Sequence, residues 1–179
     1  MLLSPRVRKA ALAAHVIASV GWLGGVVVFL LLAIAVTRSN DEQEIRGVLL
    51  AMELIGVGTL VPLSLLSFVS GLLQSFGTSW GLLRHYWVVA KLGITVVATA
   101  VLLLYVQTLR HFGVLARRSG VPVEQLQDPS PVLHSGGALV FLVAATVLSV
   151  FKPRGLTRRG WRYAQREKTR ADVDGRSAG

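Results

Sequence analysis

The chain lacks cysteine and contains little charge. None of its 179 residues is a cysteine, two are methionine and 16% are Asp, Glu, Lys or Arg. A chain without cysteine forms no disulfide, no thiolate metal site and no covalent c-type haem, and two methionines disfavour a soft-ligand copper(I) transport site. Soluble domains carry about 25% charged residues. The composition therefore excludes an ordinary soluble domain.

The short motifs of common enzyme classes are also missing. The sequence contains no P-loop, no G-x-S-x-G, no H-E-x-x-H and no cluster of aspartates. The sequence therefore gives no support for a phosphate-binding loop, a hydrolase nucleophile or a metalloprotease zinc site. These absences do not exclude every enzyme, but they favour a protein without catalytic activity.

The chain is rich in apolar residues and carries its basic excess at its two ends. Hydrophobic residues make up 53% of it, and 19 Lys and Arg against 9 Asp and Glu give a net charge of +10. Residues 1–9 contribute +3 of this charge, residues 10–151 contribute +1 and residues 152–179 contribute +6. Basic flanks around a nearly neutral, apolar middle are typical of a membrane protein. Binding to nucleic acid has no supporting motif here.

Four apolar stretches are long enough to cross the ~30 Å hydrocarbon layer of a bilayer. Apart from Arg84 at one end, Glu53 and Lys91 are the only charged residues within them. Because lipid offers the backbone no hydrogen-bond partner, we predict an all-α polytopic membrane protein, an up-and-down bundle of four transmembrane helices. The helices are expected over about 10–36, 47–76, 83–109 and 132–151. Residues 1–151 would form one transmembrane domain, and residues 152–179 a basic cytoplasmic tail that is disordered or lies at the membrane interface.

The basic residues predict the orientation of this bundle in the cell membrane. Thirteen Lys and Arg flank the spans on the side that holds both termini, against five on the other side, so both termini are expected in the cytoplasm. The first span follows three basic residues and contains the triplet Ala33, Ile34 and Ala35, as a cleaved signal peptide would. Its apolar run is roughly twice the usual 7–15 residues, so we expect it to remain as a helix.

The basic tail has two interpretations. In the first, it binds anionic headgroups of the bilayer, with Trp161 and Tyr163 at the interface, since each nearby base adds ~1 kcal/mol at an acidic leaflet. In the second, it only determines topology and stays solvated. The positive-inside bias alone accounts for its charges, which favours the second interpretation.

The second span contains a proline and a face of polar and small residues. Pro62 is expected to kink the helix, with hydroxyls such as that of Ser64 bonding the carbonyl group that the proline leaves without a donor. We expect the face to point into the bundle, where it lines a path for protons or solutes or simply bonds neighbouring helices. At helical spacing this face carries Glu53, Leu60, Ser64, Ser67, Gly71 and Gln74.

Ionisable side chains inside a span are candidates for function, because each costs ~2.5–3.5 kcal/mol on insertion scales. His15 lies inside the first span, and His85 lies at the cytoplasmic start of the third. His111 and His134 lie at the external ends of the third and fourth spans. The four histidines therefore divide between the two sides of the membrane.

The other intramembrane polar residues are Glu53, Lys91 and Gln74. Glu53 and Lys91 differ in depth by ~10 Å, so we expect no ion pair between them. Lys91 is expected to extend its ammonium group toward the cytoplasmic interface, and Glu53 to stay at the outer interface.

Small residues accompany two of the histidines along their helices. A histidine close to a glycine leaves room for a flat ring system, which a haem b held between helices requires. His15 with His85, offset by ~7 Å unless tilt closes the gap, or His111 with His134 would supply the two axial ligands. The two helix faces carry His15, Ala18, Trp22, Gly25 and Phe29, and His134, Gly137, Phe141, Ala144 and Leu148.

Two functions of different classes follow. The first is a small b-type haem-binding redox protein that works with a membrane redox partner, with His15, His85 and His134 as the favoured ligands. The second is a bundle without a cofactor, which acts as a scaffold, an accessory subunit or a permeation protein for small solutes or ions. In this second reading the histidines bond headgroups or loop carbonyls, and Gly21 and Gly25 pack within the bundle or between two protomers.

Three segments carry a resemblance to a known family. They are AHVIASVGWLGG (14–25), GTSWGLLRHYWVVAKL (77–92) and HSGGALVFLVAATVLSVFKPRGLT (134–157). The sequence resembles a family of predicted bacterial integral membrane proteins of unknown function. That family is itself distantly similar to the copper-resistance protein D type, whose helices carry a histidine followed by a W-x-G-G-like stretch. The resemblance covers residues 10–157 and implies a multi-pass membrane location, but no particular reaction.

Overall fold

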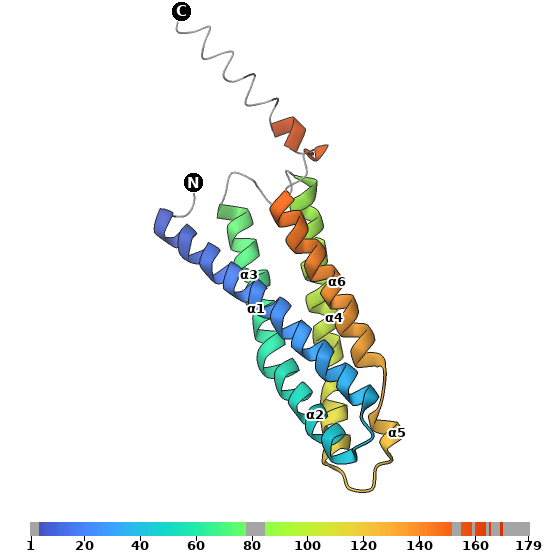
Figure 1. Cartoon of the computed structure of the whole chain (residues 1–179). Helices are drawn as coiled ribbons and strands as arrows, with labels where there is room; N and C mark the ends of the chain where they lie inside the picture. Colours follow the sequence, from blue (N-terminus) through green and yellow to red (C-terminus); the bar gives the residue numbers. More distant parts are fainter. Residues whose placement is uncertain are drawn as a thin grey trace, which may run out of the picture.

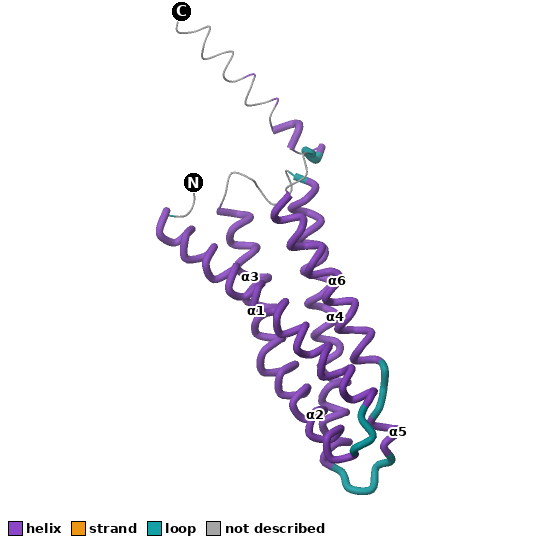
Figure 2. The backbone as a smooth tube through the Cα atoms, viewed as in Figure 1, coloured by secondary structure: helices purple, strands orange, loops and turns teal. Residues whose placement is uncertain are grey.

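Four long helical passes make up most of the part of the chain that the structure describes (Figures 1 and 2). The structure, a computed structural model, describes residues 4–77, 85–151, 155–158, 160–163, 165 and 169. The predicted bundle is confirmed, because four helical passes are long and apolar enough to span a membrane. The segments α2, η1 and α3 follow one another without a break and form one pass. The helices are α1 (Pro5–Arg38), α2 (Glu42–Ile55), the π-helical η1 (Gly56–Leu60), α3 (Val61–Gly77), α4 (Tyr86–Arg117), α5 (Val123–Leu126) and α6 (Ser130–Phe151).

The passes run alternately up and down. The start of α1, the end of α3, the start of α4 and the end of α6 lie together at one end of the bundle, here termed the terminal end (Figure 1). The short α5 lies at the opposite end, termed the loop end (Figure 1). The pass α1 packs against α3 and α6, and crosses the bundle obliquely (Figure 1). This oblique path accommodates its uncharged stretch 10–37, which at 1.5 Å per residue extends ~42 Å, against a hydrocarbon layer of ~30 Å.

The helix α4 extends further at the loop end than we predict from the sequence. We expected it to end at Leu109, because the charged Arg110 closes the apolar run. The helix continues instead to Arg117. Phe112 and Ala116 of this extension are buried, so packing against the rest of the protein stabilises the helix beyond its apolar stretch.

The helix α2 likewise begins earlier than the predicted start at residue 47. Asp41 provides its N-cap, because its Oδ1 accepts hydrogen bonds from the backbone N–H groups of Gln43 at 2.8 Å and Glu44 at 3.4 Å. An aspartate at this position satisfies donors that the first turn of a helix leaves free. The polar residues that we assigned to a connection are therefore the first turn of α2.

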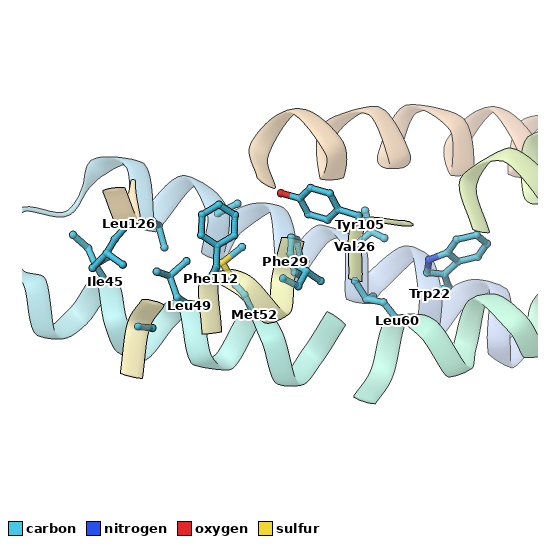
Figure 3. Packing of buried hydrophobic residues seen from close by; sticks show 14 of the residues in the cluster. Trp22, Val26, Phe29, Ile45, Leu49, Met52, Leu60, Tyr105, Phe112 and Leu126 are labelled. Atoms are coloured by element: carbon cyan, nitrogen blue, oxygen red, sulfur yellow. The ribbon is translucent and has the colours of Figure 1, made fainter. Parts of the chain in front are cut away.

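The best-buried core, part of which is shown in Figure 3, includes Leu126 of α5 and therefore lies toward the loop end. Ile45 and Leu126 are 0% exposed, and Leu49 and Met52 are 2% exposed. Phe112 of α4 belongs to the same cluster. This core resembles that of a small soluble protein, whereas the terminal half of the bundle presents apolar side chains outward, as contact with lipid requires. The exposed apolar residues there include Val16, Ile17, Val20, Leu73 and Val150.

Arg46 of α2 ties the end of α4 to the loop that follows it. Its Nη1 donates to the carbonyl oxygens of Leu115, Ala116 and Arg118 at 3.2, 3.0 and 2.7 Å. Its Nη2 donates to the carbonyl oxygen of Val121 at 3.2 Å. Since the last carbonyl groups of a helix have no partner within that helix, Arg46 caps α4 from a neighbouring helix.

The π-helical segment η1 ends at Leu60, two residues before Pro62. A proline inside a helix removes the hydrogen bond to the carbonyl four residues earlier, here that of Gly58. The chain forms a wider turn, in which the N–H of Val61 donates to the carbonyl of Gly56, five residues earlier. The hydroxyl of Ser64 donates to the carbonyl of Val61 at 2.8 Å. The sequence did not predict this π-helical segment, and the kink expected at Pro62 stays a prediction. The partner predicted for Ser64 is wrong, because its hydroxyl does not bond the carbonyl of Gly58.

Two predicted features lie largely outside the described residues. The residues between the second and third predicted spans, 77–82, do so except for Gly77, which ends α3. Much of the tail 152–179 does so as well. Within the described part of the tail, Trp161 is 60% and Tyr163 is 44% exposed. Binding of the tail to anionic headgroups stays a prediction.

Replacement of Arg46 tests its capping role. Arg46→Lys keeps the positive charge, but a lysine cannot bond four carbonyl groups and the Glu42 carboxylate at once. Arg46 contacts that carboxylate at 2.7 Å. We expect it to lower the free energy of unfolding by about 1–3 kcal/mol, measured by SDS titration of the protein in detergent micelles. Arg110→Ala is the matched control, because Arg110 is an exposed arginine of α4, and it should change stability by less than about 0.5 kcal/mol. Equal losses in the two variants would show that the carbonyl contacts do not stabilise the fold.

Candidate functional site

A seam of hydrogen-bonded polar side chains joins α1 and α3. The Nδ1 atom of His15 lies 3.0 Å from the carbonyl oxygen of Ser67 and 3.2 Å from Oγ of Ser70. The hydroxyls of Ser19 and Ser67 are 2.8 Å apart, and the amide of Gln74 donates to a carbonyl of α1 at 3.3 Å. These five residues, termed the α1–α3 seam, bond the two helices to each other where lipid offers no partner.

The hydrogen bonds of the seam fix the proton of His15. Because a carbonyl oxygen only accepts, Nδ1 of His15 carries the hydrogen that is shared with Ser67. The hydroxyl of Ser70 donates to the carbonyl of Leu66 at 2.6 Å, so its oxygen is free to accept from the same N–H. Gly71 lies against the ring, since a Cβ there would be 3.2 Å from Cε1 of His15. The ring is therefore held by α3 and faces it.

The polar face predicted on the second span points into the bundle, but its members face two different helices. Ser64 and Ser67 are buried, and Gln74 reaches α1. Glu53 instead forms an ion pair with Arg117 near the end of α4, with 2.7 Å between Oε2 and Nη1. The contacts of the described residues give this face a hydrogen-bonding role between helices.

A second polar cluster surrounds His134 in the first turns of α6. Its ring stacks on that of Tyr105 from α4, with centroids 4.2 Å apart and planes inclined by 22°. Its Nδ1 lies 2.8 Å from the carbonyl oxygen of Ser130. The hydroxyl of Tyr105 lies 2.8 Å from Oγ of Ser130, and Asp128 accepts from the backbone N–H of Ser130 at 2.6 Å. One tyrosine of α4 and the first turn of α6 therefore hold the imidazole in place.

His134 lines an apolar cavity of about 240 Å³, termed the groove, whose walls come mainly from α1, α4 and α6. None of its lining residues is Asp, Glu, Lys or Arg. Figure 3 shows Trp22, Val26, Leu60 and Tyr105 of its wall, contributed by three different passes. Leu133 at its rim is 72% exposed, so the groove is open on this side. The arrangement is an apolar, partly aromatic site with very few polar groups.

The two helix faces predicted to flank a flat ring system meet in part at the groove. Trp22 and Phe29 of α1 line it, as do His134 and Gly137 of α6. His15 does not line it, although it lies on the same face of α1 as Trp22. Seven residues separate the two, which is ~10 Å along the helix, and the ring of His15 is bonded to α3.

The remaining candidate histidines lie at separate places. His85 occupies the N-cap position of α4, without a capping bond from its side chain, and forms an isolated bridge with Leu156. His111 is exposed on α4 beside Phe112. The described contacts of His15 are made with α3, and those of His134 with Tyr105 and Ser130.

The described residues also hold no cluster of three or more His, Cys, Asp or Glu that could bind a metal ion. Lys91 lies within α4, on a different pass from Glu53. No ion pair was expected between these two residues, and Glu53 pairs with Arg117 instead.

Tyr105 and Ser130 are functional candidates that the sequence did not indicate. A tyrosine inside an apolar span carries a signal of its own, since its hydroxyl normally finds a hydrogen-bond partner when buried. The Asp128–Pro–Ser130 segment is likewise typical of a helix start. These residues lie next to His134 because of the relative position of α4 and α6. No local sequence pattern predicts that position.

No protein-family model matches the chain, and no curated protein or solved structure matches it. The resemblance to predicted bacterial membrane proteins therefore stays a prediction.

Proposed function

We propose that this protein binds an apolar molecule with a headgroup the size of one aromatic ring, which enters the groove from the bilayer. The observation that carries the proposal is the cavity itself, with apolar and aromatic walls and the fixed imidazole of His134 at one side. Small-molecule sites typically combine apolar walls with a few well-placed polar groups. The exposed rim at Leu133 provides a route from lipid.

The volume of the groove sets the size of the occupant. An apolar cavity of ~150 Å³ holds a benzene molecule, so a cavity of about 240 Å³ has room for one substituted ring. Trp22, Phe29, Tyr105 and Phe141 line this space, and aromatic side chains favour another ring in edge or offset contact. A longer apolar chain on the ring would extend into the surrounding lipid.

The enclosed space of the groove is smaller than a haem b. A porphyrin contains four pyrrole rings, and the space accommodates about one ring. His134 is the only histidine among the lining residues, so a second axial ligand is not in place. The N–H to carbonyl bonds of His15 and His134 are of the kind that metal-ligating histidines make, but they serve equally well to hold a ring between helices.

Filling the groove tests the proposed site. Gly137 lines it, and a Cβ at Gly137 would meet nothing within 4 Å, so Gly137→Leu should occupy the space without disturbing the fold. We expect this variant to bind 1-bromo-4-decylbenzene about tenfold more weakly, because the ligand must displace the new side chain. The measurement is quenching of Trp22 fluorescence in nanodiscs, in a background where Trp22 is the only tryptophan.

The adjacent Gly136 provides the matched control. A Cβ there also meets nothing within 4 Å, but Gly136 does not line the groove. Gly136→Leu should therefore leave the affinity unchanged. Saturable quenching that is the same in all three proteins would place the ligand elsewhere and refute the proposal.

An absorption spectrum separates this proposal from the haem-binding alternative. We expect protein purified in detergent from haem-replete cells to show no Soret band and no haem on pyridine extraction, because the groove holds only about one ring. A Soret band that changes in both His15→Ala and His134→Ala would contradict the ring-sized site and favour the cytochrome.

We further propose that the protein resides in the cell membrane with both termini in the cytoplasm. The support is the distribution of Lys and Arg, thirteen on the side of the termini against five on the other. A reporter fused after Gly179 should be active only if it works inside the cell, which a paired cytoplasmic and periplasmic reporter assay measures. Activity of the external reporter alone would reverse the orientation.

A further inference from the structure

Trp22 carries a hydrogen-bond donor deep in the apolar layer. It lies near the middle of α1, is 2% exposed and lines the groove. Its indole ring has one polar group, the N–H at Nε1, which can only donate. Among the residues that the structure describes, none accepts a hydrogen bond from this group. The wall of the groove therefore contains a donor without a protein acceptor.

The indole N–H faces the groove. Figure 3 shows the nitrogen on the edge of the ring that points toward Val26 and Leu60, two other residues of the groove wall. The nitrogen is not sealed off by protein atoms, in contrast to Oγ1 of Thr99 on α4. Because Trp22 as a whole is 2% exposed, the open space that its nitrogen borders is the groove.

Three other polar side chains of the groove bond within the protein. The hydroxyl of Tyr105 lies 2.8 Å from Oγ of Ser130, and Nδ1 of His134 lies 2.8 Å from the Ser130 carbonyl oxygen. The hydroxyl of Ser135 donates to the carbonyl of Pro131 at 2.6 Å.

The surroundings of the indole make an unused donor unfavourable. A bound water needs several polar partners, and the neighbouring side chains of Val26 and Leu60 offer none. A polar group without a hydrogen bond in an apolar environment costs free energy. An occupant that brings an acceptor to Nε1 of Trp22 therefore gains affinity.

We propose that the groove selects a lipid-soluble ring that carries a carbonyl group, as the headgroup of a membrane quinone does, and that the carbonyl oxygen accepts from Nε1 of Trp22. The proposal rests on the proposed function, because it concerns the same groove and names the class of its ligand. The ring lies against the aromatic wall, and its apolar tail leaves past the exposed Leu133 into lipid.

Other lipid-soluble molecules match this donor less well. A hydrocarbon ring leaves the N–H without a partner. A carboxylate accepts strongly but is charged, and no Lys or Arg lines the groove to neutralise it. A phenol accepts but brings a hydrogen of its own that also needs a partner. A carbonyl oxygen is neutral and only accepts, so it satisfies the indole and adds no further donor.

Competition between two ligands that differ only in the acceptor tests the proposal. The displaced probe is tritiated 1-bromo-4-decylbenzene, bound to the protein in nanodiscs, because its detection does not depend on tryptophan fluorescence. The competitors are 4-decylacetophenone and the analogue in which a methylene group replaces the carbonyl oxygen. One neutral hydrogen bond corresponds to about a five- to tenfold difference in affinity. We therefore expect the ketone to displace the probe at a concentration lower by this factor.

The decisive variant is Trp22→Phe, which keeps an aromatic ring in the wall and removes the N–H. We expect it to bind the probe and to lose the preference for the ketone. Trp161→Phe is the matched control, because Trp161 is 60% exposed in the tail and does not line the groove. This control should keep the preference.

An NMR measurement detects the same hydrogen bond without a substitution at Trp22, and it decides the question if Trp22→Phe does not fold. The sample is the protein in which Trp22 is the only tryptophan, in nanodiscs. We expect the ketone to move the proton signal of the indole N–H downfield of its position with the methylene analogue, because a hydrogen bond to an oxygen deshields the proton.

The outcomes separate the ligand class from the site. Equal displacement by the two competitors in the unmodified protein overturns the carbonyl assignment, as does a preference that survives in Trp22→Phe or an indole signal at the same position with both ligands. Each of these results leaves the groove as a binding site for apolar rings. Failure of the probe to bind the unmodified protein, or binding that Gly137→Leu does not weaken, overturns the proposed function as well.

Discussion

Inside a bilayer, a polar group that is not bonded within the protein has no water to bond, and this constraint determines most of the arrangement. Three examples show a side-chain donor that meets a backbone carbonyl. His15 bonds the carbonyl of Ser67 across α1 and α3, His134 bonds that of Ser130 within α6, and Arg46 bonds the last carbonyls of α4. The two histidines thereby have a fixed tautomer, and the arginine secures the helix end against which the loop-end core packs.

The spans could be predicted from the sequence because length and absence of charge are sufficient to identify them. The helix ends at the loop end could not, because Arg110 closes the apolar run while the helix continues. Beyond it, Phe112 and Ala116 are buried in a core that also contains Ile45 and Leu126. This part follows the rules of a soluble protein, in which one face of a helix is apolar and the other is not.

The candidate site shows the same division between local and non-local information. The spacing of residues along single helices predicted two helix faces that could flank a flat ring. One face includes Trp22 and the other Gly137, and both residues line the groove. The side chain that contacts each histidine could not be predicted, since it depends on the relative depth and rotation of two helices. The partner of His134 is Tyr105, a residue of another pass that no pattern along α6 contains. The sequence therefore indicated where a ring has room, but not which side chain would stack beside the imidazole.

The π-helical segment η1 explains why Glu53 is not part of the face that its spacing indicates. Seven residues separate it from Leu60, which in a regular helix puts both on one side. Across η1 the buried positions are Met52, Gly56, Leu60 and Ser64, in steps of four. A π turn takes up roughly one residue more than an α turn, so α2 and α3 differ in phase by about one residue. The second pass therefore consists of two amphipathic helices joined by a one-residue insertion. The buried face of α2 belongs to the loop-end core, whereas the buried face of α3 carries the serines that face α1.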